Sequence, residues 1–199
     1  MVAVAGAISA TAAANRSLEE QERKALTDRL HRLATYDGLT GCLNYQAFQE
    51  ALSSESTQAE RYGRVFSVVI ADLDGFKTIN DHHGHAVGDV TLTTLAAEML
   101  QGVRSVDKVG RIGGDEFAVL LPETSSDEAE ALVERIRSRT LAAVTPERVT
   151  VSFGVSTWCG KGDSASELLR RADAALYEAK RHGRNRIAVW SDSCVPPHP

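Results

Sequence analysis

The sequence is poor in cysteine, and its cysteines are isolated. Three cysteines occur in 199 residues, and Cys42, Cys159 and Cys194 are far apart, without a CxxC spacing. An odd number of separated cysteines argues against a disulfide framework and against a zinc site. We therefore expect reduced thiols, as in a cytoplasmic protein.

The sequence also lacks an excess of positive charge. It contains 22 Lys and Arg against 27 Asp and Glu, a formal net charge of −5. The protein then has no overall positive electrostatic potential that would attract a nucleic acid polymer. An anionic ligand needs a local cluster of cations or a metal ion. The 43% hydrophobic and 25% charged residues are typical of a globular protein with one well-packed domain.

Residues 1–15 lack charge altogether. This run is too short to span a membrane as a helix, and it lacks the basic start of a signal peptide. A disordered leader and the end of a membrane segment from a longer parent protein are both consistent with it. At the other end, the Pro-rich residues 195–199 belong to a tail, residues 192–199, that we expect to be disordered.

Residues 17–34 have the pattern of a charged helix, and their first four residues, SLEE, resemble a capping box. Leucines at positions 18, 26, 30 and 33 recur at helical spacings, but the stripe is barely two heptads long. Such a helix either pairs with a second copy or is a solvated linker. We divide the chain into residues 1–34, the leader with a linker or dimerisation helix, and residues 35–191, a folded domain.

Strand-like and helical segments alternate within this domain. Strands are expected at residues 65–71, 107–112, 117–121, 149–156 and 187–190. Helices are expected at residues 45–52, 76–79, 90–103, 126–140 and 165–181. This alternation predicts an α/β (α+β) fold with a central mixed five-stranded sheet flanked by helices, preceded by an N-terminal helical extension.

Two glycines and two carboxylates lie at the tip of the predicted hairpin, in the run RIGGDEF at residues 111–117. Both glycines can adopt the positive φ of a tight turn, and their lack of side chains lets a phosphate approach the backbone. Asp115 and Glu116 are then suited to hold the divalent cation that accompanies a triphosphate. A surface hairpin with two solvated acids is the alternative for this motif taken alone.

A second pair of acids follows the first buried strand. Acids at the end of a hydrophobic strand are costly to desolvate unless a cation or hydrogen bonds satisfy them. N-capping of the next helix explains Asp74 but leaves Asp72 without a role. Because neighbouring strands lie about 4.8 Å apart, Asp72 and Asp115 can bind one Mg²⁺ if the first strand pairs with the hairpin.

Four separated motifs together resemble the GGDEF family of diguanylate cyclases. They are DLDGFKTIND at residues 72–81, GHAVGD at 84–89, RIGGDEF at 111–117 and ADAALYEAKRHGRN at 172–185. The resemblance runs from about Leu33 to Trp190. The turn at residues 37–41 also looks like the one that opens the family's domain, with Tyr45 in place of a basic residue and Cys42 in place of the commoner Leu.

This resemblance implies a fold similar to the palm of nucleotidyl cyclases and polymerases. It implies that two GTP molecules are condensed into cyclic di-GMP with release of two pyrophosphates, between the domains of a homodimer. It also implies two Mg²⁺ or Mn²⁺ ions per active site. The alternative is a non-catalytic GGDEF module that binds GTP or cyclic di-GMP and relays a signal; a phosphohydrolase or an adenylate-type cyclase would need a different base-reading pair.

The resemblance further implies roles for individual residues. The metal-binding and catalytic group comprises Asp72, Asp115, Glu116 and the main-chain carbonyl of Leu73. Glu116 either completes the second metal site or assists deprotonation of the attacking hydroxyl. The substrate-binding group comprises Asn80 and Asp89 for guanine, Lys77, Lys180 and Arg184 for the triphosphate, and Phe76, Gly113 and Gly114. Lys180 and Arg184 also suit a simpler role as cations at a helix C-terminus.

A separate RxxD pattern precedes the hairpin. Arg104 and Asp107 match the site at which this family binds its own product as an inhibitor, and Arg135 is a second contact. An arginine can hold a phosphate or a guanine edge with two hydrogen bonds, and the aspartate can accept from guanine. A surface ion pair between residues three apart is the usual explanation of such a pattern.

Overall fold

The computed structural model describes the backbone of residues 2–143, 149–160 and 162–191. Two compact units are distinguished, residues 1–36 and residues 37–199. The first unit contains helix α1 (Val2–Thr35), which includes the uncharged leader. The leader is therefore helical and not disordered, consistent with the high helix propensity of its many alanines. No helix in the described part of the chain is long and apolar enough to cross a membrane. The expected tail at residues 192–199 lies outside the described residues.

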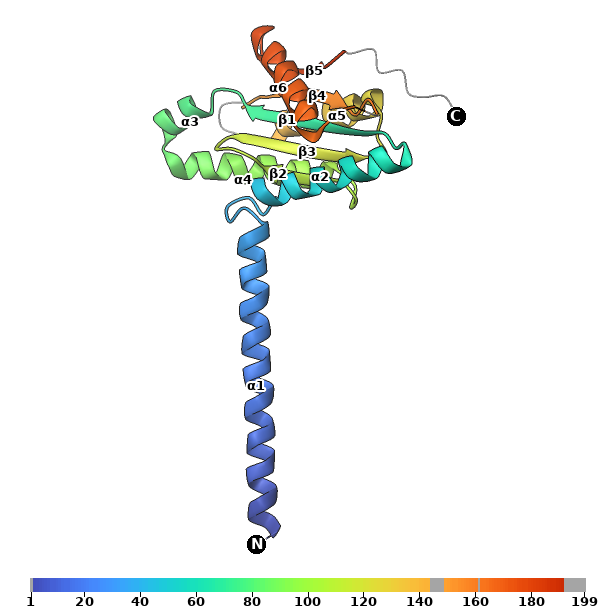
Figure 1. The fold of residues 1–199 in the computed structure, drawn as a ribbon. Coiled ribbons are helices and arrows are strands. Elements are labelled where there is room, and N and C mark those ends of the chain that lie inside the picture. Colours follow the sequence, from blue (N-terminus) through green and yellow to red (C-terminus); the bar gives the residue numbers. More distant parts are fainter. Residues whose placement is uncertain (1, 144–148, 161, 192–199) are drawn as a thin grey trace. The chain divides into compact units, whose positions relative to one another are not determined.

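The second unit contains the predicted mixed sheet. Its elements are α2 (Tyr45–Tyr62), β1 (Phe66–Leu73), α3 (Phe76–His83), α4 (His85–Gly102), β2 (Lys108–Arg111), β3 (Glu116–Pro122), α5 (Ser126–Ala143), β4 (Val151–Thr157), α6 (Ala165–Arg181) and β5 (Ile187–Val189). The five strands are ordered β2-β3-β1-β4-β5. All neighbours are antiparallel except β4 and β5, which are parallel. The predicted fold class is thus confirmed (Figure 1).

Helices α2, α3 and α4 are longer than the sequence pattern predicted, and α3 reaches His83 instead of Ile79. Helix α2 continues through the polar stretch to Tyr62, where Gly63 ends it with a left-handed φ of 66°. Ser56 is buried within this helix, and its hydroxyl is satisfied by donating to the Leu52 carbonyl at 2.8 Å. Helix α4 begins directly after α3, at His85. The added turns contain mostly polar or small residues, so the apolar pattern alone placed the helix ends too far inside.

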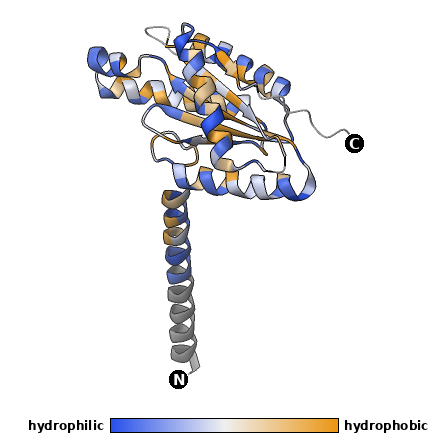
Figure 2. Cartoon of the chain, turned by 45° about the horizontal axis from the view of Figure 1, so that its top comes forward, coloured by the Kyte–Doolittle hydropathy of each residue, from blue (hydrophilic) through white to orange (hydrophobic). Residues whose placement is uncertain are grey.

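Helices cover both faces of the sheet. Alternate β1 residues Val69, Ala71 and Leu73 belong to a core cluster that includes residues of α4 and α5. The intervening residues Phe66 and Val68 belong to a cluster built with α2 and α6. Hydrophobic colour accordingly follows the strands, while the helices carry hydrophilic faces outward (Figure 2). Because side chains alternate along a strand, Asp72 faces the α2 and α6 side.

Helix α6 lies unusually close to β4 at Gly154. A Cβ at this position would lie 2.1 Å from the carbonyl oxygen of Ala172 and 2.3 Å from the amide nitrogen of Leu176. Both of these are backbone atoms of α6, so only glycine permits the contact. The close packing fixes the middle of α6 against the middle of β4.

One cysteine differs from the expectation of reduced thiols. Cys42 is free and buried, and burial raises the pKa of its thiol to about 11. Cys159 is disulfide-bonded, so the prediction is wrong for this residue. It is exposed in the loop after β4, and the spacing of cysteines in the sequence carries no information on such a bond. Cys194 lies outside the described residues.

Candidate active site

Acidic residues meet where β1 ends and β3 begins. Asp72 is the register partner of Glu116 in the antiparallel pair, and the N–H of Leu73 donates to the carbonyl of Asp115 at 3.3 Å. The pairing of the first strand with the hairpin, on which the expected metal site depends, is therefore present. Directly opposed residues in such a pair have Cβ atoms about 5 Å apart, so the carboxylates of Asp72 and Glu116 share one face of the sheet.

A cation from α6 joins these acids. The ammonium of Lys180 lies 2.8 Å from Oδ2 of Asp72. Burial raises the pKa of Asp72, and the charges of Asp115 and Asp74 add to this, while hydrogen bonding and charge from Lys180 act in the opposite direction. Lys180 is thus the counter-charge of a partly buried carboxylate, a position that its place near a helix C-terminus does not by itself indicate.

Glu116 experiences the same surroundings. Burial raises the pKa of its carboxyl, as do the nearby charges of Asp72, Asp115 and Asp173, and Lys180 opposes them. Asp173, on α6, received no role from the sequence motifs. The signal that could have found it is the spacing of seven residues between Asp173 and Lys180, which puts both on one face of the helix.

The donor atoms in this cluster are those that a hard divalent cation takes. Carboxylates of Asp72, Asp115 and Glu116 and the main-chain carbonyl of Leu73 are oxygen ligands of the kind that Mg²⁺ and Mn²⁺ prefer. Within the described ranges, no three His, Cys, Asp or Glu side chains are already arranged around a common metal position. Burial, with the charges of the neighbouring acids, raises the pKa of Asp72 and of Glu116, and a divalent cation bound here would favour their ionised forms.

The hairpin tip does not use the glycine conformation that we expected. Neither Gly113 nor Gly114 is among the residues with positive φ. The tip is instead a wider turn, in which the N–H groups of Ile112 and Gly113 donate to the Glu116 carbonyl at 2.9 and 3.3 Å. Gly113 provides space, because a Cβ there would lie 2.6 Å from Oε2 of Glu116. Gly114 has no atom within 4 Å of its Cβ position, so the tip is open to a ligand.

An arginine ties the hairpin tip to the turn that opens the domain. The guanidinium of Arg111 donates to the Gly114 carbonyl through Nη2 at 2.6 Å and Nε at 3.1 Å. Its Nη1 donates to Oδ1 of Asp37 at 3.1 Å. Burial opposes ionisation of Asp37, but hydrogen bonds from Thr40 and Arg111 outweigh it and hold the pKa of Asp37 below its usual value. Sequence reasoning missed this link between two motifs.

The two residues expected to recognise guanine lie at the corner between α3 and α4. Among the described side chains, Oδ1 of Asn80 is buried without a hydrogen-bond partner. A Cβ at Gly88 would lie 2.0 Å from that oxygen and 3.2 Å from Cζ of Phe76, so a glycine is needed for Asn80 to fit. Asp89 follows Gly88 and is exposed. A buried, unpaired acceptor is unfavourable, and an N–H from a ligand would satisfy it.

The remaining phosphate-binding candidates, Lys77 and Arg184, are exposed. Lys77 lies on α3, and Arg184 lies in the loop after α6 with a left-handed φ of 60°. Nε of Arg184 is 4.0 Å from Oδ1 of Asp74, which follows Asp72 by two residues. Arg184 therefore lies beside the acid cluster, next to the last turn of α6 that carries Lys180.

The RxxD residues form a second, separate group. Nη2 of Arg104 lies 3.0 Å from Oδ1 of Asp107 and also donates to the Pro122 carbonyl at 3.1 Å. The side chain of Asp107 is fully buried, and that of Arg104 is half exposed. Arg135 donates to the carbonyl of Gly102 at 2.8 Å, close to Arg104 in the chain. The expected ion pair between Arg104 and Asp107, three residues apart, is therefore present.

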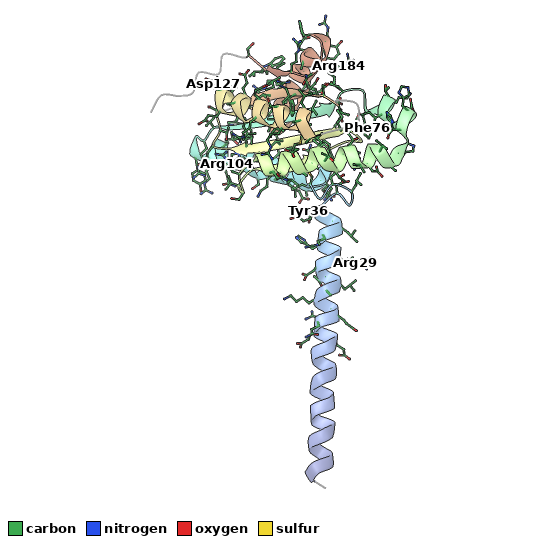
Figure 3. All side chains as sticks on the ribbon, turned by 180° about the vertical axis from the view of Figure 1, so that it is seen from behind. Arg29, Tyr36, Phe76, Arg104, Asp127 and Arg184 are labelled. Carbon is green, nitrogen blue, oxygen red and sulfur yellow. The ribbon has the colours of Figure 1, made fainter. Side chains whose placement is uncertain are left out.

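This second group lies at the far end of β3 from the acid cluster. Pro122 ends the strand that Glu116 begins. At about 3.4 Å per residue, the two groups are on the order of 20 Å apart. In Figure 3, Arg104 and Phe76 lie on opposite sides of the domain.

Comparison with known proteins shows the family to which the chain belongs. A family model described as diguanylate cyclase, GGDEF domain, matches residues 34–186. Diguanylate cyclase DgcP of Pseudomonas aeruginosa is 39% identical over 178 residues, which cover 86% of this chain and 25% of DgcP. The chain thus spans about a quarter of the length of that relative.

Solved structures agree with the sequence comparison. The coiled coil and GGDEF domain of DgcB from Caulobacter crescentus, in complex with c-di-GMP, superposes with a TM-score of 0.82 at 30% identity, covering 88% of this chain and 96% of that one. Diguanylate cyclase SiaD from Pseudomonas aeruginosa, in complex with its activator SiaC, gives a TM-score of 0.75 at 34% identity and covers 90% of this chain and 70% of that one.

Proposed function

Because the chain belongs to the GGDEF family of diguanylate cyclases, we propose that it condenses two GTP molecules into cyclic di-GMP and releases two pyrophosphates. The observation that carries the proposal is the β1 and β3 register, which brings Asp72 beside Glu116 at the open hairpin tip. Nζ of Lys180 lies 2.8 Å from Oδ2 of Asp72. A non-catalytic module that only binds nucleotide would not need these acids, and all of them are present.

In the proposed reaction, the 3′ oxygen of one GTP attacks the α-phosphorus of the other. The bond from that phosphorus to the pyrophosphate group breaks, the hydroxyl proton is lost, and a second round closes the ring. Two Mg²⁺ or Mn²⁺ ions, held by Asp72, Asp115, Glu116 and the Leu73 carbonyl, would activate the hydroxyl and balance charge on the leaving group. Glu116 either completes the second ion site or takes up the hydroxyl proton.

Selectivity for guanine rests on the α3 and α4 corner. Asn80 has a buried acceptor without a partner, and Asp89 has an exposed carboxylate nearby. Both accept hydrogen bonds, and guanine offers the N1 and N2 donors that adenine lacks in that arrangement. Phe76 packs at this corner, while Gly113 and Gly114 leave the hairpin tip free of side chains. Lys77, Lys180 and Arg184 provide the charge that a triphosphate requires.

One domain holds one GTP, so the proposed reaction needs a second copy of the chain. Helix α1 supports pairing, because Leu26, Leu30 and Leu33 are 59%, 57% and 66% exposed at spacings of four and three residues. Apolar residues at such spacings form the contact stripe of paired helices. The relative from Caulobacter crescentus was likewise solved with a coiled coil attached to its GGDEF domain. A solvated linker remains the alternative for this segment.

Product inhibition is the proposed role of Arg104, Asp107 and Arg135. These residues lie on the order of 20 Å from the acid cluster along β3, so a product molecule bound there does not obstruct the acids of the same domain. It would act by holding two domains apart. Residues 35–191 are the catalytic domain in this proposal, acting on GTP in the cytoplasm.

Incubation with GTP and MgCl₂, followed by mass identification of the product, tests the proposed function. We expect cyclic di-GMP and pyrophosphate from GTP, and no cyclic dinucleotide from ATP under the same conditions. Binding of GTP without any product would favour the signal-relay module. Faster turnover of ATP than of GTP would contradict the roles of Asn80 and Asp89.

A further inference from the structure

Asp74 is an acid of the first motif that the proposed reaction leaves without a role. Capping of α3 does not explain it, because the N-cap residue of that helix is Gly75 and no side chain bonds to the cap. The side chain of Asp74 is only 6% exposed. It must therefore be satisfied by hydrogen bonds, and the structure shows which ones.

Both carboxylate oxygens of Asp74 accept hydrogen bonds. Oδ2 accepts from the Thr150 hydroxyl at 2.7 Å and from the backbone N–H of Asn185 at 3.0 Å. Oδ1 accepts from the Ser152 hydroxyl at 2.8 Å. Thr150 and Ser152 flank the start of β4, and Asn185 belongs to the loop after α6. The carboxylate thus joins the ends of two strands to the loop that carries Arg184.

This loop has an unfavourable backbone conformation that needs support. Arg184 and Asn185 have φ values of 60° and 48°, in the left-handed region that residues with a side chain rarely adopt. Asn185 is held on two sides, because its N–H donates to Asp74 and its Oδ1 accepts from Nη1 of Arg137 at 2.8 Å. Arg137 comes from α5, so the loop is clamped between the sheet and a helix.

We propose that Asp74 is a positioning residue, which holds the 183–185 loop so that Arg184 faces the triphosphate of bound GTP. The inference rests on the proposed function and deepens it. Asp74 lies two residues after Asp72, just beyond the end of β1, and its Oδ1 is 4.0 Å from Nε of Arg184. The hydrogen bonds to the loop backbone set its shape, and the negative charge attracts the guanidinium only weakly at this distance.

Binding of 3′-deoxy-GTP to the full chain with Mg²⁺ tests this role, because this nucleotide lacks the attacking hydroxyl and binds without turnover. We expect Asp74→Ala to weaken its affinity by about tenfold, the loss produced by removing hydrogen bonds to an ionised group. Asp74→Asn is the conservative variant. Its amide oxygen can still accept from Asn185, so it should retain most of the affinity.

A double-mutant comparison isolates the pathway through Arg184. In an Arg184→Ala background, Asp74→Ala should cause little further loss of affinity, because the guanidinium that it positions is gone. Equal fold-losses in both backgrounds would overturn the proposal, as would an Asp74→Ala variant that binds as wild type does. Glu98→Ala is the matched control. Glu98 is a partly buried acid on α4, and its Oε2 lies 2.8 Å from Nε of Arg139 on α5. Its removal should lower the melting temperature without changing the affinity for 3′-deoxy-GTP.

A failure of the proposed function would give different binding and activity results. A wild-type protein that binds no 3′-deoxy-GTP and makes no cyclic di-GMP would refute the reaction itself. A wild type that does both, with an Asp74→Asn variant as weak as Asp74→Ala, would show that charge and not loop geometry is the contribution of Asp74. That last result would overturn the positioning role while leaving the reaction intact.

Discussion

Replacement of Asp37 by alanine should remove the hydrogen bond that links the turn at the start of the domain to Arg111 at the hairpin. The Asp37 carboxylate accepts from the Thr40 N–H at 2.9 Å, the Thr40 hydroxyl at 2.6 Å and Nη1 of Arg111 at 3.1 Å. Hydrogen bonds to charged groups contribute about 1.5–3 kcal/mol each in favourable sites, but they are not additive. Since the Asp37 side chain is a quarter exposed, we expect a total loss of about 2 kcal/mol.

This loss should depend on pH in a defined direction. The pKa of folded Asp37 lies below its ordinary value of 3.8. Its contribution to the free energy of unfolding is therefore complete above that value and disappears as the pH falls through the lower, folded pKa. The free energies of unfolding of wild type and Asp37→Ala in urea should differ by about 2 kcal/mol near pH 7. The difference should narrow as the pH falls below the ordinary pKa of 3.8.

The same variant should affect catalysis, because Arg111 would keep only its bonds to the Gly114 carbonyl. We expect a lower kcat with little change in the affinity for 3′-deoxy-GTP, since the guanine corner and the loop after α6 are untouched. Glu178→Ala removes an exposed ion pair with Arg181 and should cost less than about 1 kcal/mol at any pH. A stability loss in Asp37→Ala that is equally small, or that grows as the pH falls, would refute the reasoning.

Three further predictions concern the substrate corner, the second site and the pairing of domains. Gly88→Ala would place a Cβ 2.0 Å from Oδ1 of Asn80, so KM for GTP should rise by about tenfold while the discrimination against ATP declines; unchanged discrimination would count against Asn80 as a guanine reader. Arg104→Ala should relieve inhibition by added cyclic di-GMP without raising the initial rate, and an unaltered inhibition curve would exclude the RxxD residues as the product site. Specific activity should increase with protein concentration until dimers are saturated, whereas a constant value down to nanomolar protein would argue against a shared active site.

The arrangement of the strands that carry the acid cluster was accessible from the sequence. The β-branched run before Asp72 predicted a buried central strand, and the Gly-Gly pair between two short apolar runs predicted a hairpin. Pairing of these segments was a condition in that reasoning, and the β1 and β3 register fulfils it. The layered fold followed from the alternation of strands and helices.

Contacts between distant segments were not accessible. The bond of Asp74 to Asn185 joins residues 111 positions apart, and the Arg111 bond to Asp37 joins residues 74 positions apart. Local propensity and periodicity hold no information on such pairs. The positive φ expected for Gly113 and Gly114 was wrong for a related reason, because hairpins of several lengths share the same glycines and only the hydrogen-bond pattern distinguishes them.

The most direct measurement of the central claim is the rate of cyclic di-GMP formation by Asp115→Ala, compared with wild type at equal protein concentration. Circular dichroism and the melting temperature would establish that the variant is folded. If the acids between β1 and β3 hold the metal ions of a diguanylate cyclase, product formation should fall by at least about a hundredfold. A folded Asp115→Ala variant that forms cyclic di-GMP at the wild-type rate would contradict the account.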